Sequence, residues 1–243
     1  MTSGEQSGKL GGEARSEQGG EERSELCAVR WRDGIIPVSI RFDDPYFSLA
    51  DGLAETRHVF LAANDLPARY VPGFHVAELG FGTGLNLLAA LLAWRASATP
   101  GPLRYTSFEA YPLTAPTMAR ALDAFPQARA IADPVLAQWA NGPTIRLPDL
   151  HADIVLGDAR DTLPQWHGLA DAWFLDGFSP AKNPELWTPD LMAHVARHTA
   201  PHGTFATYTA AGHVRRALAD AGFAVQRRPG HGRKRHMSAG VKR

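Results

Sequence analysis

The sequence of 243 residues lacks several features that would place it in a special class. Its single cysteine, Cys27, excludes an internal disulfide and a zinc site built on cysteines. Its longest purely apolar run, Leu87 to Trp94, is far short of the ~20 residues that a membrane-spanning helix needs. The amino terminus also lacks the apolar segment of a secretory signal peptide. We therefore expect a location in the reducing cytoplasm, with no membrane partner.

The chain also lacks an excess of either charge, because 25 basic residues balance 25 acidic ones. The two signs are nevertheless separated along the chain. Residues 1–27 are rich in Glu, Gly and Ser and offer little to bury, so we predict a disordered acidic tail there. The stretch from Arg215 onward is strongly basic, with Asp220 as its one acid. Such a cluster fits either a polyanionic partner such as nucleic acid or an ordinary solvent-exposed face.

The signatures of several enzyme classes are missing as well. There is no Gly-Lys-Ser/Thr of a phosphate-binding P-loop. His194 and His198 are four residues apart, but the Glu of the His-Glu-x-x-His zinc pattern is absent, so we predict surface histidines and no metal. Ser179 does not stand in a Gly-x-Ser-x-Gly turn, which leaves a serine hydrolase unsupported.

Apolar strand-like runs and helical runs alternate along most of the chain. This alternation predicts an α/β domain with a mostly parallel sheet, which we place at residues 67–243. An N-terminal extension at residues 28–66 is predicted to hold a β-hairpin, a loop and a helix. Within the domain we expect a helix that opens at Pro112, and only a short helix and a loop over residues 133–150.

The most specific local pattern is Glu-Leu-Gly-Phe-Gly-Thr-Gly-Leu-Asn at residues 78–86, where a predicted strand turns into a helix. Its alternate glycines let the backbone approach a ligand closely. The spacing differs from the Gly-x-Gly-x-x-Gly of dinucleotide-binding loops. The preceding acid suits S-adenosylmethionine (SAM), whose sulfonium and ammonium groups are positive. We therefore predict a SAM-binding loop with the residues Glu78, Gly80, Phe81, Gly82, Thr83, Gly84 and Asn86.

Three further acids, Glu109, Asp158 and Asp176, each follow an apolar run that is predicted to be a strand. Because the carboxyl ends of parallel strands meet at one edge of a sheet, we expect these acids to lie together with the glycine loop. We predict that Glu109 binds the ribose hydroxyls of SAM and Asp158 its adenine amino group. Each acid taken alone could equally be a helix N-cap, and the combination with the glycine loop favours SAM.

The run from Asp176 to Glu185, Asp-Gly-Phe-Ser-Pro-Ala-Lys-Asn-Pro-Glu, predicts a rigid loop at the end of a central strand. An alkyl amine, with a solution pKa of ~10, must lose a proton before it can attack a methyl donor. A carboxylate can hold the amine in line and help remove that proton, so Asp176 is the predicted catalytic residue. The alternative is that Asp176 only binds the ammonium of SAM and that transfer works by proximity. Phe178 is predicted to stack on a base.

Five stretches resemble, in order, the methyltransferase domain of the MnmC family, which also occurs alone as MnmD-type proteins. They are FDDPYFS (42–48), GLAETRHVFL (52–61), ELGFGTGLN (78–86), DAWFLDGFSPAKNPE (171–185) and ATYTAAG (206–212). The resemblance implies a class I SAM-dependent methyltransferase with a Rossmann-like, mostly parallel, seven-stranded sheet. It also implies transfer of a methyl group to the aminomethyl nitrogen of 5-aminomethyl-2-thiouridine at the tRNA wobble position, which gives 5-methylaminomethyl-2-thiouridine.

By this resemblance, Asp176 lies between the methionine end of SAM and the acceptor amine. Tyr46, Phe178 and Lys182 would hold the wobble base, and the tRNA would contact Arg233, Lys234 and Arg235. The family often joins this domain to an FAD-dependent oxidase. We expect neither FAD nor an oxidase step in this chain, so a separate oxidase or upstream tRNA-modifying enzymes would supply the substrate. Two alternatives stay open: a SAM-dependent N-methyltransferase for a small-molecule amine, and a non-catalytic module that binds SAM or RNA.

Overall fold

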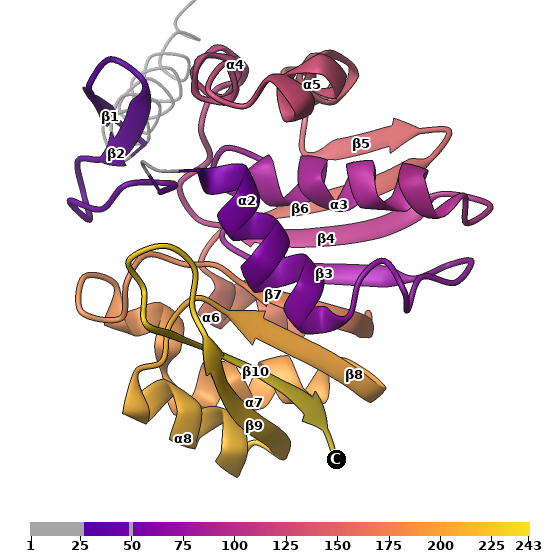
Figure 1. Ribbon diagram of the computed structural model, residues 1–243, viewed down its shortest axis with the longest axis vertical. Helices are drawn as coiled ribbons and strands as arrows, with labels where there is room; N and C mark the ends of the chain where they lie inside the picture. The colour runs from indigo at the N-terminus through magenta and orange to yellow at the C-terminus, as the bar shows by residue number, and fades with distance from the viewer. Residues whose placement is uncertain (1–26, 49–50) are drawn as a thin grey trace, which may run out of the picture.

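The computed structural model describes residues 27–48 and 51–243 (Figure 1). The acidic tail predicted for residues 1–27 lies outside this range, apart from Cys27. The described part is built around an eight-stranded sheet. Its strands, in spatial order, are β5 (Thr144–Leu147), β6 (Leu150–Leu156), β4 (Leu103–Glu109), β3 (His75–Leu79), β7 (Ala170–Leu175), β8 (Thr199–Thr207), β10 (His236–Lys242) and β9 (Phe223–Pro229).

The predicted α/β fold with a mostly parallel sheet is confirmed. Strands β6, β4, β3, β7 and β8 are parallel to one another, while β10 runs antiparallel to both β8 and β9. The prediction of seven strands is wrong by one, because β5 adds an antiparallel edge strand beside β6. This strand has four residues, of which only Ile145 is fully buried, so its sequence carries little of the alternation that identifies a strand.

Helices cover both faces of the sheet. They are α3 (Leu85–Ser97), α4 (Ala115–Leu122), α5 (Pro126–Trp139), α6 (Ala159–Thr162), α7 (Pro189–Arg197) and α8 (Gly212–Asp220), with 3₁₀ turns at Leu163–Gln165 and Pro184–Trp187. Successive residues of a strand point to opposite faces, and β7 shows the result. Phe174 packs in the core with α3 and α5, whereas Trp173 packs in the core with α7 and α8.

Two predicted helix boundaries are wrong. The helix expected to open at Pro112 begins at Ala115, because the hydroxyl of Thr114 accepts the N–H of Thr117 and so caps the helix there. The short helix expected over residues 133–150 is the end of α5, which already begins at Pro126. Pro134 lies inside this helix, although a proline there removes a hydrogen bond and usually marks a helix start or break.

The N-terminal extension has two described parts, a hairpin beside the sheet and a helical segment that packs with α3 on one face of the sheet (Figure 1). Strands β1 (Val29–Arg32) and β2 (Ile36–Ser39) pair as an antiparallel hairpin, and α2 (Gly52–Thr56) continues as a π-helical turn (Arg57–Leu61) and a 3₁₀ turn (Ala62–Asn64). The hairpin contacts α4, because the guanidinium of Arg120 lies 3.8 Å from the centre of the Trp31 ring. Among the described residues, no helix is long and apolar enough to cross a membrane.

Candidate functional site

The loop between β3 and α3 has the conformation that only glycine adopts easily. Gly80, Gly82 and Gly84 all have positive φ angles, of 88°, 52° and 75°. A Cβ atom on Gly80 would lie 2.5 Å from the carbonyl oxygen of Asp176, so this glycine lets the loops after β3 and β7 touch. Gly84 precedes α3 as its N-cap residue without a side-chain cap, which leaves the first N–H groups of the helix available to a ligand.

A cavity of about 1040 Å³ lies at the carboxyl ends of β3, β4, β6 and β7. Most of the predicted site residues line it, namely Tyr46, Gly80, Phe81, Gly82, Thr83, Asn86, Glu109, Asp158, Asp176, Phe178, Lys182, Arg233 and Lys234. Three predicted residues do not: Glu78 is buried beneath the cavity, Gly84 caps α3, and Arg235 is exposed beside it. The structure therefore brings the strand-end acids and the glycine loop to one place, as the sequence predicted.

Asn86, in the first turn of α3, joins two of the acids. Its amide Nδ2 donates to Glu78 Oε1 at 2.8 Å and to Asp176 Oδ2 at 2.6 Å. Its Oδ1 accepts the hydroxyl of Thr56 at 2.9 Å, and the second oxygen of Glu78 accepts the hydroxyl of Ser107 at 2.7 Å. Burial raises the pKa of Glu78 to about 8 and that of Asp176 to about 6. At neutral pH, Glu78 is therefore mostly protonated and Asp176 mostly ionised.

Glu109 ends β4, and its two carboxylate oxygens accept backbone N–H groups. Oε2 accepts from Gly82 at 3.0 Å and Oε1 from Tyr111 at 2.7 Å. Burial raises the pKa of this carboxyl group, and the backbone donors act in the opposite direction. The carboxylate thus fixes the glycine loop and keeps lone pairs that can accept the hydroxyls of a ribose.

Asp158 differs from the other strand-end acids. Its Oδ1 accepts the N–H of Arg160, so the N-cap alternative applies to this acid, at the start of α6. The Arg160 guanidinium also donates to both carboxylate oxygens, from Nε to Oδ1 at 3.0 Å and from Nη2 to Oδ2 at 2.6 Å. This ion pair lowers the pKa of Asp158. Asp158 faces the cavity as an ion-paired carboxylate.

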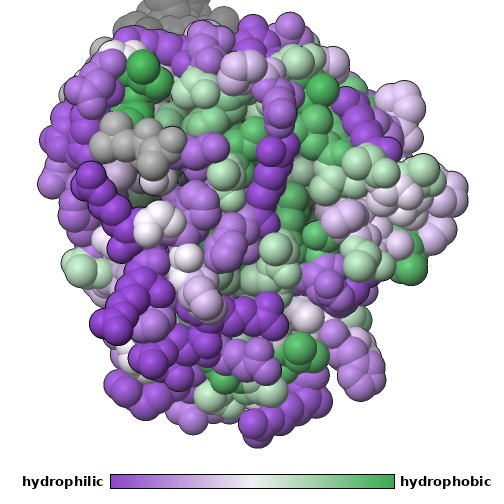
Figure 2. Space-filling view, viewed as in Figure 1, coloured by the Kyte–Doolittle hydropathy of each residue, from purple (hydrophilic) through white to green (hydrophobic). Residues whose placement is uncertain are grey.

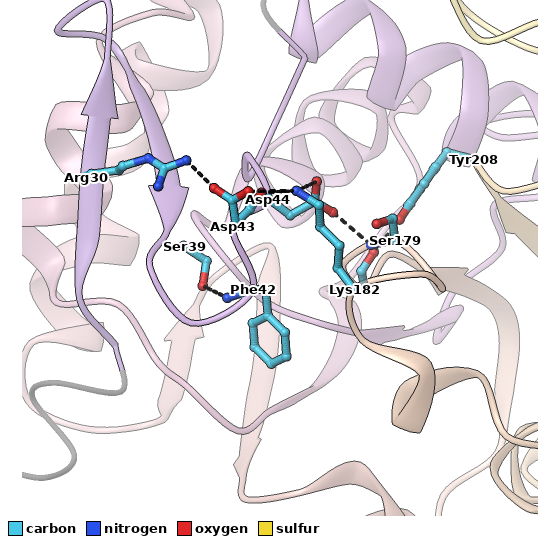
Figure 3. Close-up of polar contacts among 9 residues, drawn as sticks. Arg30, Ser39, Phe42, Asp43, Asp44, Ser179, Lys182 and Tyr208 are labelled. Carbon is cyan, nitrogen blue, oxygen red and sulfur yellow. Dashed lines mark hydrogen bonds and ion pairs between the residues drawn. The ribbon is translucent and has the colours of Figure 1, made fainter.

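The loop that follows the N-terminal hairpin packs on the loop after β7 (Figure 3). Ser179 donates its backbone N–H to Asp44 Oδ2 at 2.8 Å, and the Lys182 ammonium bonds to the carbonyl oxygen of Asp43. The Phe42 ring stacks on Phe178, with 4.8 Å between ring centres. Lys182, predicted to contact the base, thus bonds to this loop and also lines the cavity.

Tyr46 meets Phe178 edge to face, with 5.1 Å between ring centres. Both rings line the cavity, together with Phe42 and Tyr111. Two of the predicted base-binding residues therefore form one aromatic wall with partners that the sequence did not single out. A wall of this kind offers flat surfaces on which a base can stack.

The three predicted tRNA-binding residues, Arg233, Lys234 and Arg235, are all exposed in the loop between β9 and β10. The Lys234 ammonium also lies 2.8 Å from Glu55 Oε1. Glu55, on α2, was not predicted, because a single acid on an amphipathic helix gives no functional signal. The face seen in Figure 2 is largely hydrophilic over α8 and β9, where basic residues such as Arg216 and Arg227 are exposed. In the part of the chain that the structure describes, no group of three or more acids, histidines or cysteines is placed to hold a metal ion.

Comparisons with known proteins agree with this geometry. A family model described as S-adenosyl-L-methionine-dependent methyltransferase matches residues 126–243. The chain is 46% identical over 228 residues to the tRNA 5-methylaminomethyl-2-thiouridine biosynthesis bifunctional protein MnmC of Pseudoalteromonas atlantica; the match covers 84% of this chain and 32% of that protein. It is 48% identical over 225 residues to the protein of the same name from a Caulobacter species, with 87% and 37% covered. This chain therefore spans about a third of the length of these relatives.

A solved structure, MNMC2 from Aquifex aeolicus, superposes on this chain with a TM-score of 0.72 and 27% sequence identity. The match covers 87% of this chain and 68% of that one. The similarity thus extends over most of this chain.

Proposed function

Because this chain belongs to the family of SAM-dependent methyltransferase domains found in MnmC proteins, we propose that it methylates a modified uridine in tRNA. The acceptor is the aminomethyl nitrogen of 5-aminomethyl-2-thiouridine at the wobble position, and the product is 5-methylaminomethyl-2-thiouridine. The observation that carries the proposal is Asp176, a partly buried acid that lines one cavity together with the glycine loop and the aromatic wall. We also propose a division of the chain into an extension at 28–66 and the methyltransferase domain at 67–243.

The residues of the cavity fit SAM. The glycine loop offers close backbone approach, and the uncapped first turn of α3 offers N–H donors to the methionine carboxylate. Glu109 keeps lone pairs for the ribose hydroxyls, and Asp158 can accept the adenine amino group while Arg160 holds it. SAM, when bound, supplies a methyl group on a sulfonium whose departure leaves a neutral thioether.

Asp176 prepares the acceptor amine in this proposal. Its carboxylate holds the amine in line and takes the proton from nitrogen, so that the freed nitrogen lone pair forms the new bond to the methyl carbon. A pKa raised to about 6 makes Asp176 a better proton acceptor than an ordinary aspartate, yet leaves it ionised at neutral pH. The step moves no electrons to or from a redox carrier, so FAD has no part in it.

The exposed arginines favour a nucleic acid over a small amine as the substrate. Arg233 lines the cavity together with Lys182, Tyr46 and Phe178, and Arg235 is exposed in the same loop, so the phosphates around a flipped base would contact this loop. The aminomethyl group must already be present on the tRNA. A separate oxidase or upstream modifying enzymes would therefore supply it.

The test combines methyl transfer with SAM binding. We expect the purified chain to move tritiated methyl from SAM to tRNA that carries 5-aminomethyl-2-thiouridine, and not to the same tRNA without the aminomethyl group. Asp176→Ala should abolish transfer while calorimetry still detects SAM binding. Transfer at the wild-type rate in this variant would refute the role of Asp176, and transfer to low-molecular-weight amines alone would favour the small-molecule alternative.

The arginines are tested by charge reversal. Arg233→Glu and Arg235→Glu should weaken tRNA binding and reduce the slope of log affinity against log salt by about one for each phosphate that is no longer neutralised. The slope should stay unchanged in a variant at a distant exposed arginine, such as Arg95→Glu, which serves as the control. An unchanged slope in the two loop variants would exclude this loop from the tRNA interface.

A further inference from the structure

Lys234 is the residue of the basic loop whose position sets it apart. Its ammonium lies 2.8 Å from Glu55 Oε1 and 4.0 Å from the centre of the Tyr208 ring, at the wall of the cavity. The Tyr208 hydroxyl donates to the carbonyl oxygen of Gly177 at 2.7 Å, and Gly177 follows Asp176 in the chain. The loop between β9 and β10, helix α2 and the end of β8 therefore meet beside Asp176.

The packing of these three segments determines which charged groups lie near Asp176. From beneath, Asn86 donates to its carboxylate, and Glu78 and Tyr105 are buried nearby. On the cavity side, Lys234, Glu55 and Tyr208 line the same cavity as Asp176. Glu55 by itself would place a second negative charge near Asp176, and the Glu55 side chain is only 11% exposed, so water screens it poorly. The ammonium of Lys234 cancels that charge.

We propose that Glu55 and Lys234 form a positioning pair in which the ammonium of Lys234 offsets the charge of Glu55, so that the Asp176 carboxylate stays ionised and ready to take the proton of the acceptor amine. Lys234 acts here through Asp176 and not through a tRNA phosphate. The inference rests on the proposed function for the identity of the amine, whereas the effect on Asp176 exists without any substrate. Glu55 and Lys234 oppose each other in this effect: Lys234 lowers the pKa of Asp176 and Glu55 raises it.

The direct test is an NMR titration of the apo protein labelled with ¹³C at the aspartate carboxyl carbons. The Asp176 signal is identified by its loss in Asp176→Asn. Lys234→Met should shift the titration midpoint of Asp176 upward, and Glu55→Gln should shift it downward, each by roughly half a pH unit to one pH unit. The double variant should titrate near the wild type, because both charges are then absent. Arg235→Met is the matched control, since this neighbour is exposed and does not line the cavity.

The same shift should appear in the pH dependence of kcat/KM with aminomethyl-bearing tRNA. This constant reports ionisations of the free enzyme and free substrate, and the free tRNA contributes equally for every variant. The change of slope that marks Asp176 should move to higher pH in Lys234→Met and stay in place in Arg235→Met. Lys234→Arg keeps the positive charge and should therefore restore the wild-type pH dependence of kcat/KM.

The outcomes separate the two proposals. If the Asp176 midpoint is the same in wild type, Lys234→Met and Glu55→Gln, the positioning pair is refuted, whatever the substrate. If Lys234→Met only weakens tRNA binding and flattens its salt dependence, Lys234 binds a phosphate and the pair is likewise refuted. If the midpoints shift as expected but the wild type does not methylate the tRNA, the proposed substrate is wrong and the pair stands. Thermal unfolding of each variant near neutral pH identifies any that fail to fold.

Discussion

Replacing Glu78 by glutamine should leave the protein intact at neutral pH and change how its stability depends on pH. Glu78 is completely buried, and its oxygens meet the amide of Asn86 and the hydroxyl of Ser107. Because burial raises its pKa to about 8, the side chain is mostly neutral at pH 7. Glutamine has the same shape, carries no charge, and can accept from Asn86 while its amide donates to the Ser107 oxygen.

The magnitude follows from the pKa of Glu78. A carboxyl group whose folded pKa is raised stabilises the protein fully below its unfolded pKa, and this contribution is lost as pH rises through the folded pKa. For Glu78 the window runs from the ordinary value of 4.5 to about 8. The difference corresponds to at most about 5 kcal/mol at 1.36 kcal/mol per pH unit. Asp176 shares the amide of Asn86, and relaxation around a buried ion lowers its cost, so we expect about 2 to 5 kcal/mol.

Urea unfolding at intervals from about pH 5 to pH 9 measures this difference directly. The free energy of unfolding of the wild type should fall relative to that of Glu78→Gln as pH rises. Glu78→Ala serves as a contrast, because it deprives Asn86 and Ser107 of a hydrogen-bond partner and should be less stable than Glu78→Gln by about 1 to 3 kcal/mol at every pH. A stability difference between wild type and Glu78→Gln that is constant with pH would mean that Glu78 is ionised throughout, and the reasoning would be wrong.

Three other substitutions test the contacts of the cavity. Gly80→Ala places a Cβ atom against the Asp176 carbonyl oxygen at a φ of 88°, so it should lower stability by about 1 to 3 kcal/mol and weaken SAM binding in calorimetry. Asn86→Ala removes the donor that lowers the pKa of Asp176, so the slope change in the pH profile of kcat/KM should move above pH 6. Asp44→Ala removes the acceptor of the Ser179 N–H, so hydrogen exchange of this amide should accelerate about tenfold, equivalent to about 1.4 kcal/mol, with little change in Tm.

The sequence predicted the parts of this fold that depend on local patterns. The run that becomes β3, the glycine turn and α3 follow one another without interruption, so periodicity and turn chemistry suffice. The position of the strand-end acids follows from topology, because parallel strands end at the same edge. The missed strand β5 and the late predicted start of α5 have local causes too. The strand is too short to show alternation, and Pro134 lies inside a continuous helix, where a proline usually indicates a helix start or break.

The contacts that join distant segments could not be predicted in this way. Glu55 and Lys234 lie almost at opposite ends of the described chain, and no spacing rule connects them. The bond of Lys182 to the backbone of Asp43 is equally non-local, and it joins a residue that lines the cavity to the N-terminal loop. Such pairings depend on how the N-terminal loop and the loop between β9 and β10 pack over the sheet. The spacing of residues along the chain does not contain this information.

The strand-end acids show why counting carboxylates overstates the negative charge that a ligand meets. Glu78 is mostly neutral near pH 7, and Asp158 is paired with Arg160. Glu109 is bound by two backbone N–H groups, and Asp176 is mostly ionised beside an acid that Lys234 neutralises. The cavity therefore presents few effective negative charges, each at a different place. A ligand with two separated positive groups fits such an arrangement better than a polycation does, because the positive groups are matched one by one and the remaining acids contribute hydrogen bonds in place of net charge.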